Sequence, residues 1–452
     1  MTAATADIPG RGSFARGIHP AGRKSLASGA AIEVLPTPKT VLIPLSQHIG
    51  APCEPVAKPK TAVAVGDVVG DVKAFVAAPV HSSVDGLTGA PTVTTLPNAR
   101  HVAAIPIAAA DEQALAGRAL FDDLFGGDWP TRGLGAHAPE AVGEAVRNAG
   151  VVGMGGATFP THVKLARNEA RPVDTLIVNG CECEPYLTAD HRLMLEAAGA
   201  IVTGSLLAAH AAGAERIIVA IEDNKPDAVE AMRRASEGTG ITVAAVNTQY
   251  PMGGERCLVP AVMGRAIPTG GLPLDVGVVV VNVGTASAIA AAVLRGRALT
   301  HRVISVTGEG VSRPKNILAP VGASYGDLIA FCGGLKPDAA RVVAGGPMMG
   351  FALAELDVPV TKGTSGVVVL TDSQLRRADE TACIRCGRCV DACPLGLVAS
   401  RIALAVRARD WDVAKRYHLP ACVECGCCNY VCPAQIPLVQ LIRTGKAMMP
   451  RD

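Results

Sequence analysis

The sequence predicts a multidomain α/β protein, and three observations support this prediction. The chain has 452 residues, which is too many for one hydrophobic core. Between residues 139 and 299, apolar strand-like runs alternate with alanine-rich helical runs, the pattern of a parallel sheet covered by helices. Towards the C-terminus, two cysteine runs share one spacing, which is typical of metal-binding domains. We therefore expect several domains of different types.

Composition and charge restrict the classes of function. Hydrophobic residues make up 49% of the chain and aromatic residues only 3%, as expected of a soluble globular protein. The net charge of +2 gives no support for nucleic-acid binding. Locally, residues 376–452 contain twelve Lys or Arg and seven Asp or Glu, a net charge of +5. This excess favours an acidic partner, although a solvated basic face explains it equally well.

The N-terminal third is expected to be an arm, a β domain and a linker. Residues 1–35 are predicted to form an irregular arm, and no signal peptide is expected because no apolar run accompanies its basic residues. From 36 to 110, short β-branched runs are broken by Gly and Pro, which predicts a small β-barrel or sandwich. A linker is expected at 111–138.

The β domain resembles the lipoyl- and biotinyl-carrier fold in the runs Val63–Gly70 and Ala78–Gly86. The tip where a carrier lysine would lie holds His81, Ser82 and Ser83 instead. We therefore expect a structural, lipoyl-like module without an attached lipoyl or biotinyl group.

Residues 139–299 are predicted to form a Rossmann-like parallel α/β domain. Strands are expected at four apolar runs: Thr175–Val178, Arg216–Ile221, Ile241–Val246 and Val278–Val281. Helices are expected around Arg192–Ala212 and Asp227–Glu237. The stretch Val276–Leu294 is long enough to span a membrane, but polar residues interrupt its middle, which predicts a buried strand that turns into a helix.

Parallel sheets bind ligands at the carboxyl ends of their strands, so the loops of this domain are candidate sites. The loop Gly150–Thr161 is rich in glycine and is followed by Lys164, a combination that suits an anionic phosphate. It matches neither the Rossmann fingerprint nor the P-loop. Three further polar loops are Val178–Tyr186, Tyr250–Glu255 and Asn282–Thr285. In the first of these, Cys181 and Cys183 are expected to be small buried residues rather than metal ligands.

The two cysteine runs both read C-x2-C-x2-C-x3-C-P, the spacing of bacterial two-cluster ferredoxins. In this spacing the first three thiolates bind one [4Fe-4S] cluster and the fourth binds the other. The expected ligand sets are therefore crossed: Cys383, Cys386, Cys389 and Cys432 for one cluster, and Cys422, Cys425, Cys428 and Cys393 for the other. Between the runs, residues 398–417 are predicted to be helical.

Zinc is the main alternative for the cysteine runs, because C-x2-C pairs also build zinc sites. Four-cysteine zinc sites usually show two separated pairs rather than two runs of four, which favours iron–sulfur clusters. Cys427 breaks the ligand period and is expected to be a non-ligand thiol. Cluster cysteines must stay reduced, so a cytosolic compartment is expected.

Together, the loops and the cysteine runs resemble one family, the C subunit of the Rnf electron-transport complex. The matching stretches cover nearly the whole chain: Gly153–Thr161, Asn179–Arg192, Tyr250–Glu255, Gly270–Pro273, Asn282–Thr285, Gly345–Gly350 and both cysteine runs. The resemblance implies an FMN in the α/β domain, as in the NADH-oxidising subunit of respiratory complex I. It also implies a β-grasp domain of the soluble-ligand-binding type (SLBB) at 300–370, for which we infer no ligand, and an α-helical two-cluster domain at 371–452.

The resemblance also implies roles for individual residues. Those expected to hold the FMN phosphate and ribityl chain are Gly153, Gly155, Gly156 and Lys164. Those expected to hydrogen-bond the flavin are Asn179, Asn282 and Thr285. Those expected at the flavin and NADH pocket are Glu182, Glu184, Gly254 and Glu255. Cys181 stands where complex I relatives carry an acidic residue, and no residue is expected to act as a catalytic acid or base.

The function that the resemblance implies is electron entry. NADH would be oxidised, or NAD reduced, and electrons would pass through FMN and two [4Fe-4S] clusters to membrane-embedded and cluster-bearing Rnf subunits, coupled to ion translocation. Ferredoxin would act at the far end of the path. The expected location is peripheral, on the cytoplasmic face of the bacterial inner membrane. The alternatives are a related cobalamin reductase of microcompartments and a non-catalytic cluster relay or scaffold.

Overall fold

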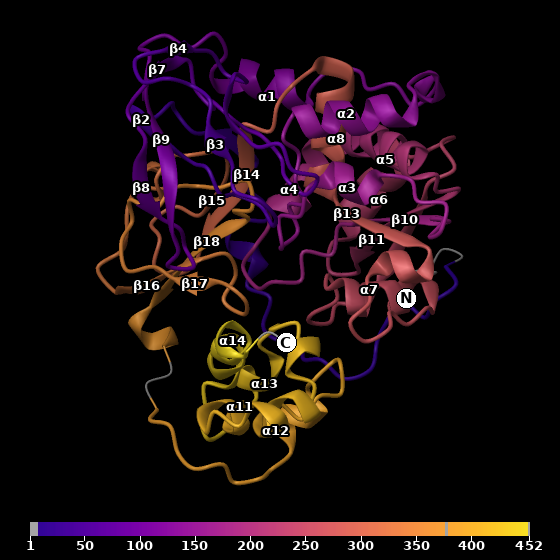
Figure 1. The fold of residues 1–452 in the computed structure, drawn as a ribbon, viewed down its shortest axis with the longest axis vertical. Coiled ribbons are helices and arrows are strands. Elements are labelled where there is room, and N and C mark those ends of the chain that lie inside the picture. The colour runs from indigo at the N-terminus through magenta and orange to yellow at the C-terminus, as the bar shows by residue number, and fades with distance from the viewer. Residues whose placement is uncertain (1–7, 376–377, 451–452) are drawn as a thin grey trace.

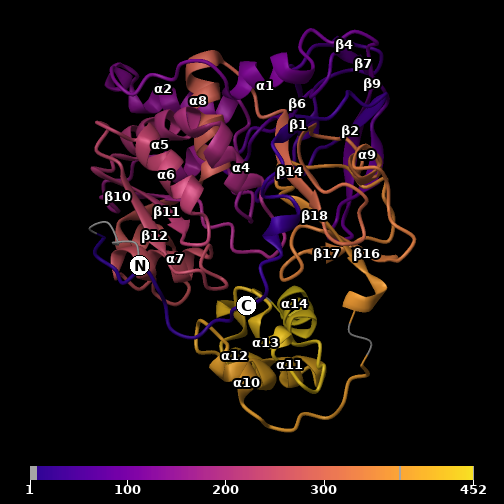
Figure 2. The same cartoon turned by 180° about the vertical axis from the view of Figure 1, so that it is seen from behind.

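The computed structural model describes residues 8–375 and 378–450, which fold into four parts (Figure 1). An N-terminal β domain packs beside a parallel α/β domain. A mixed sheet lies between the β domain and a small helical domain that carries the cysteine runs. The helical domain lies at the opposite end from the β domain, next to both the mixed sheet and the α/β domain (Figures 1 and 2).

The N-terminal β domain consists of two antiparallel sheets. The larger sheet contains β2 (Thr40–Pro44), β9 (His101–Ala109), β7 (Gly86–Thr88), β4 (Ala62–Val63) and β8 (Thr92–Thr95). The smaller sheet contains β3 (Glu54–Pro55), β5 (Val68–Asp71) and β6 (Val80–His81). Alternate side chains such as Val41, Ile43 and Val69 fill the space between the sheets. The predicted tip is buried, with Ser83 Oγ donating to Val321 O over 2.6 Å.

Two segments expected to be irregular carry regular structure. In the arm, η1 (Lys24–Leu26) is followed by β1 (Ile32–Val34), which pairs in parallel with a strand of the mixed sheet. In the expected linker, α1 (Gly117–Phe125) precedes η2 (Leu134–Ala136). These elements form because tertiary packing overrides weak local signals: Leu120 and Phe121 of α1 are buried in the main apolar core.

The α/β domain is built on a fully parallel four-stranded sheet of order β12-β11-β10-β13. Its strands are β10 (Thr175–Asn179), β11 (Arg216–Glu222), β12 (Thr242–Val246) and β13 (Val278–Asn282), which confirms the predicted strands. Its helical elements are α2 (Pro139–Asn148), α3 (Thr161–Leu165), α4 (Ala189–Glu196), α5 (Ala198–Ala212), α6 (Pro226–Ala235), α7 (Glu255–Met263), η3 (Pro273–Val276) and α8 (Val283–Arg295). The stretch Val276–Leu294 is a strand followed by a helix, as predicted.

The helix predicted at Arg192–Ala212 is wrong as a single element. The chain turns by 95° between α4 and α5, because Ala197 leaves the helical region with φ −134°. After the turn, α5 packs closely along α8. A Cβ at Gly204 would lie 1.7 Å from Ala286 O, so only glycine permits this approach.

In the described part of the chain, no single helix has the length and apolar character needed to cross a membrane. The bent pair α4–α5 meets that test only when its two helices are counted together.

The mixed sheet has six strands in the order β1-β15-β14-β18-β16-β17. Its strands are β14 (His301–Thr307), β15 (Lys315–Pro320), β16 (Ala339–Ala344), β17 (Phe351–Ala352) and β18 (Gly366–Thr371), joined by β1 of the arm. Ser324 precedes helix α9 (Tyr325–Phe331) and caps it with its side chain. The short helix η4 (Asp372–Gln374) follows β18. This is the part of the chain expected to form the β-grasp domain.

The C-terminal domain is helical. Its elements are α10 (Arg388–Asp391), α11 (Ala399–Arg407), α12 (Trp411–Arg416), η5 (Leu419–Ala421), α13 (Cys427–Tyr430) and α14 (Leu438–Met448). The helix predicted at 398–417 is interrupted: Arg409 takes a left-handed φ of 55°, and Asp410 caps α12 through Val413 N. Residues 376–377, which belong to the domain predicted at 371–452, lie outside the described residues.

Candidate cofactor sites

Two asparagines expected to contact the flavin lie side by side at the carboxyl edge of the parallel sheet. Asn179 ends β10 and Asn282 ends β13, and the two residues are paired directly in the strand register. Asn179 Nδ2 donates to Gly253 O over 2.9 Å. Asn282 Oδ1 accepts from Gly284 N over 2.8 Å and so caps α8. The structure thus brings three of the predicted loops together at one edge.

The glycine-rich loop lies over the end of β13. Met154 N donates to Thr285 Oγ1 over 3.0 Å, which fixes the loop to the first turn of α8. A Cβ at Gly155 would lie 3.3 Å from the Cβ of Asn282. Gly156 has φ 151°, and a Cβ there would meet nothing within 4 Å. The loop therefore presents bare backbone beside the strand ends, which fits a flavin held by backbone N–H groups.

Lys164, expected to bind phosphate, has an acidic partner within the chain. Its Nζ donates to Glu255 Oε1 over 2.9 Å and to Val280 O over 3.2 Å. Glu255 begins α7, directly after the N-cap Gly254. The ion pair joins the end of α3 to the start of α7 and neutralises the one lysine that follows the glycine-rich loop.

The two glutamates of the loop after β10 have structural partners. The Glu182 carboxylate accepts from Asp190 N over 2.8 Å and His191 N over 3.2 Å, which places it at the N-terminus of α4. The Glu184 carboxylate accepts from Met348 N over 3.1 Å and Met349 N over 2.8 Å. Burial raises the pKa of Glu184 to about 7, against the lowering effect of those two N–H groups. The expected position of Glu182 and Glu184 at the flavin and NADH pocket stays a prediction.

Two lysines that sequence reasoning missed, the partly buried Lys24 and the buried Lys225, support the same loop. Lys24 of the arm donates to Glu182 O over 2.7 Å, Glu184 O over 3.1 Å and Leu187 O over 2.7 Å. Lys225 is 1% exposed and donates to Cys181 O over 2.6 Å. No local signal marks either residue, because the carbonyls that they bind are far away in sequence. Cys181 itself is fully buried, as predicted.

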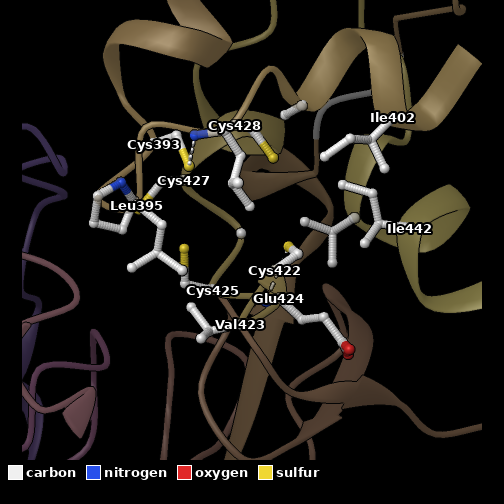
Figure 3. Close-up of a pocket in the computed structure, with 15 residues that line it drawn as sticks. Cys393, Leu395, Ile402, Cys422, Val423, Glu424, Cys425, Cys427, Cys428 and Ile442 are labelled. Carbon is white, nitrogen blue, oxygen red and sulfur yellow. Dashed lines mark hydrogen bonds between the residues drawn. The ribbon is translucent and has the colours of Figure 1, made fainter. Parts of the chain in front are cut away.

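Four cysteines of one predicted crossed set surround a single cavity in the helical domain (Figure 3). They are Cys393, Cys422, Cys425 and Cys428. Apolar side chains close the cavity on another side, where Figure 3 shows Ile402 and Ile442. Backbone N–H groups point at two of the sulfurs: Leu397 N lies 3.3 Å from Cys393 Sγ, and Glu424 N lies 3.4 Å from Cys422 Sγ. N–H···S bonds of this kind are typical of iron–sulfur sites.

The thiols around this cavity need a bound metal centre to stay ionised. Among the residues that the structure describes, no three His, Cys, Asp or Glu side chains converge on one metal position. Burial raises the pKa of Cys422 to about 11 and raises that of Cys428 further, so a positively charged centre is needed to keep them as thiolates.

The other crossed set lies nearer the surface. Cys383 and Cys389 pack against the helical core that contains Cys432, whereas Cys386 is exposed. The neighbouring Ile384 side chain is 66% exposed. The two cluster sites therefore differ in their access to solvent and to other proteins.

The buried cluster site packs directly on the loops at the strand ends. Tyr250 Oη donates to Cys425 O over 2.7 Å, and Tyr250 is only 2% exposed. Cys427, the non-ligand thiol, is fully buried in the same contact. A Cβ at Gly426 would lie 2.7 Å from Met348 O, so the second cysteine run touches the turn that Glu184 holds. No other domain separates the two cofactor sites.

Family models assign each part of the chain. The RnfC barrel sandwich hybrid domain matches residues 12–112 and the Nuo51 FMN-binding domain matches 146–291. The SLBB domain matches 303–352 and the 4Fe-4S dicluster domain matches 376–434. These matches confirm the predicted fold class and the predicted cofactors, FMN and two [4Fe-4S] clusters.

Curated relatives match nearly the whole chain. The C subunit of a proton-translocating ferredoxin:NAD(+) oxidoreductase complex from Clostridium ljungdahlii is 43% identical, with 95% of this chain and 93% of the relative covered. Its Na(+)-translocating counterpart from Acetobacterium woodii is 41% identical, with 96% of each covered. The C subunit of an ion-translocating oxidoreductase complex from Rhodobacter capsulatus is 41% identical, with 97% and 83% covered. The chain belongs to the RnfC family, the C subunits of ion-translocating oxidoreductase complexes.

Proposed function

We propose that this chain is the peripheral subunit through which a membrane-bound Rnf-type complex exchanges electrons with NAD(H). Relatives 41–43% identical are named as subunits of ferredoxin:NAD(+) oxidoreductase complexes, which supports this role. FMN supplies a centre that exchanges a hydride with NAD(H) and single electrons with the clusters. Ferredoxin lies at the far end of the proposed path.

The observation that carries the proposal is the direct packing of a cluster site on the flavin loops. The Tyr250 hydroxyl holds the backbone of Cys425, a proposed cluster ligand, against the loop that continues to Gly253 and Glu255. A relay needs its cofactors held close together and shielded from water, and this buried contact supports both requirements. None of these residues needs to accept or donate a proton, so their role is to bind and orient.

The exposed cluster site is the proposed exit. Cys386 is exposed, and the exposed Arg385 and Arg388 flank it without an ion pair in the part of the chain that the structure describes. A basic rim around an exposed cluster suits a partner subunit with an acidic face near its own redox centre. This arrangement supports binding to cluster-bearing or membrane-embedded Rnf subunits, which would hold the chain on the cytoplasmic face of the inner membrane.

An add-back experiment tests the proposal. Membranes from a strain that lacks this chain should lose ferredoxin-dependent NAD+ reduction and regain it when the purified chain with its cofactors is added. A flavin-free preparation should rebind the membranes without restoring activity and serves as the control. Full activity in the depleted membranes would contradict the proposal. Rapid reduction of cob(II)alamin by NADH and the purified chain would instead favour the cobalamin reductase alternative.

A further inference from the structure

Arg302 of β14 is a buried cation without an anionic partner. Arg302 is only 4% exposed. Nε donates to Thr364 O over 3.3 Å, and Nη1 lies against the sulfur of Met154. Among the described residues, Nη2 has no hydrogen bond and the guanidinium has no ion pair. A buried charge left in this state is costly, so an anion is expected beside it.

The guanidinium lies at the N-terminus of α8, next to the glycine-rich loop. A Cβ built on Gly284 would lie 3.4 Å from Arg302 Nη1 and 3.4 Å from Met154 Sδ. Gly284 is in the first turn of α8, a helix of 13 residues, whose N-terminal N–H groups favour negative charge. Arg302, Gly284 and Met154 line one cavity together with Ser287. A buried cation and a helix N-terminus thus face the same space.

No acidic side chain in the part of the chain that the structure describes forms an ion pair with Arg302. The nearest acidic influence is Asp190, but its Oδ2 is engaged with Asn282 Nδ2 over 2.7 Å and it forms no ion pair with Arg302. Burial, reinforced by Glu182, raises the pKa of Asp190 to about 7, so this carboxyl is about half protonated at pH 7 and only partly offsets the charge of Arg302. Lys164, the other cation near the glycine-rich loop, is already paired with Glu255. Arg302 is therefore the cation left available to the cofactor.

We propose that Arg302, with the N-terminus of α8, binds the phosphate group of FMN. A guanidinium can donate two parallel hydrogen bonds to a phosphate, and these hydrogen bonds are stronger in a buried site than in water. The β-grasp domain would then contribute directly to the flavin site, through a residue outside every loop that the sequence singled out. This inference rests on the FMN binding of the α/β domain.

The test compares FMN with riboflavin, which lacks the phosphate. The full-length chain with both clusters, freed of flavin, is titrated anaerobically with each compound by quenching of flavin fluorescence. Arg302→Gln should weaken FMN binding at least about tenfold, since 1.4 kcal/mol is tenfold and a hydrogen bond to a charged group exceeds that, and should change riboflavin binding less than about twofold. Arg297→Gln is the matched control: Arg297 lines the same cavity but is paired with Asp123 over 2.6 Å, and both affinities should stay unchanged.

Several results would overturn the inference. If Arg302→Gln weakens the binding of FMN and of riboflavin equally, Arg302 has a structural role. If the variant changes only the KM for NADH, the anion that Arg302 binds is a phosphate of the nucleotide substrate. If the Arg302→Gln variant loses its clusters, Arg302→Lys is used in its place. An ammonium group cannot form two parallel hydrogen bonds to a phosphate, so the preference of this variant for FMN over riboflavin should fall at least about threefold. Wild-type protein that binds both compounds equally also overturns it. Wild-type protein that binds no flavin at all contradicts the proposed function itself.

Discussion

At the scale of single residues, Glu184 connects the two cofactor regions. Its carboxylate accepts N–H groups from Met348 and Met349, and Arg443 donates to Met349 O over 2.9 Å from the cluster-bearing domain. Burial raises the pKa of Glu184 from 4.5 to about 7. The folded chain therefore binds this proton more tightly than the unfolded chain does. The stability contributed by Glu184 is fully present below pH 4.5 and is lost as the pH rises through 7.

The loss of stability on deprotonation of Glu184 leads to a prediction for Glu184→Gln. Met348 N and Met349 N donate to different carboxylate oxygens, so the single amide oxygen of Gln keeps one of these two hydrogen bonds at any pH, and the amide does not titrate. Between pH 6 and pH 8, the wild type should lose stability relative to the variant, with a total effect on the order of 1 kcal/mol. Apparent melting temperatures at both pH values, measured at one scan rate, check this. Parallel curves for the two proteins would show that Glu184 does not titrate in this range.

Also at the residue scale, the crossed ligand sets make a specific prediction. Cys393→Ser should remove the same cluster as Cys425→Ser, although Cys393 belongs to the first run, because both line one cavity. Each variant should retain about four irons per chain, and the two should leave the same electron paramagnetic resonance signal after reduction. Different residual signals would assign Cys393 to the other cluster.

At the scale of elements, the two cysteine runs differ at equivalent glycines. Gly387 and Gly426 precede α10 and α13 with left-handed φ values of 78° and 86°. A Cβ at Gly387 would meet nothing within 4 Å, whereas a Cβ at Gly426 would lie 2.7 Å from Met348 O. The second run is therefore both a cluster loop and a docking surface.

Alanine substitutions at these two glycines should separate the role of each run as a cluster loop from the role of the second run as a docking surface. Gly387→Ala should cost only the left-handed strain, about 1 kcal/mol. Gly426→Ala should also push the loop away from Met348 and lower the rate at which NADH reduces the clusters, while flavin reduction stays fast. Stopped-flow absorbance resolves the two steps. Equal rates of cluster reduction in both variants would contradict the docking role of Gly426.

Regular elements were predictable where apolar periodicity is local, and much of the remainder was not. The strands of the parallel sheet end within one or two residues of their predictions because continuous Val and Ile runs signal burial directly. The turn at Ala197 escaped prediction because its neighbours Glu196 and Ala198 are good helix formers, and Gly199 is only a weak signal in a chain rich in glycine. Long-range contacts of Lys24, Lys225 and Arg302 carried no local signal at all.

At the scale of the whole molecule, Lys362 joins three domains. It lies between β17 and β18, and its Nζ donates to Pro79 O of the β domain and to Gly150 O at the start of the glycine-rich loop, each over 2.7 Å. Its backbone N donates to Gln47 Oε1 over 2.9 Å. Burial lowers the pKa of Lys362 from 10.5 to about 7. One side chain thus sets where the flavin loop begins relative to both neighbouring domains.

Lys362→Met should destabilise the assembled chain by about 1–3 kcal/mol, because two buried carbonyls lose their donor. Its pH dependence has the opposite sign to that of Glu184. The unfolded chain holds the Lys362 proton up to pH 10.5 and the folded chain releases it near pH 7, so the wild type should gain stability over the variant from pH 7 to pH 9. Thermal unfolding of both proteins measures this, and a constant difference would contradict the buried, neutralised lysine.

The central claim is that electrons enter this chain from NADH through FMN and reach two [4Fe-4S] clusters. Anaerobic purification followed by a cofactor census tests it most directly: iron and sulfide per chain, flavin released by acid, and bleaching of the visible spectrum by NADH. The account predicts about eight irons, one FMN and rapid bleaching. Eight irons without flavin and without a response to NADH would contradict it and leave the chain as a cluster relay or scaffold.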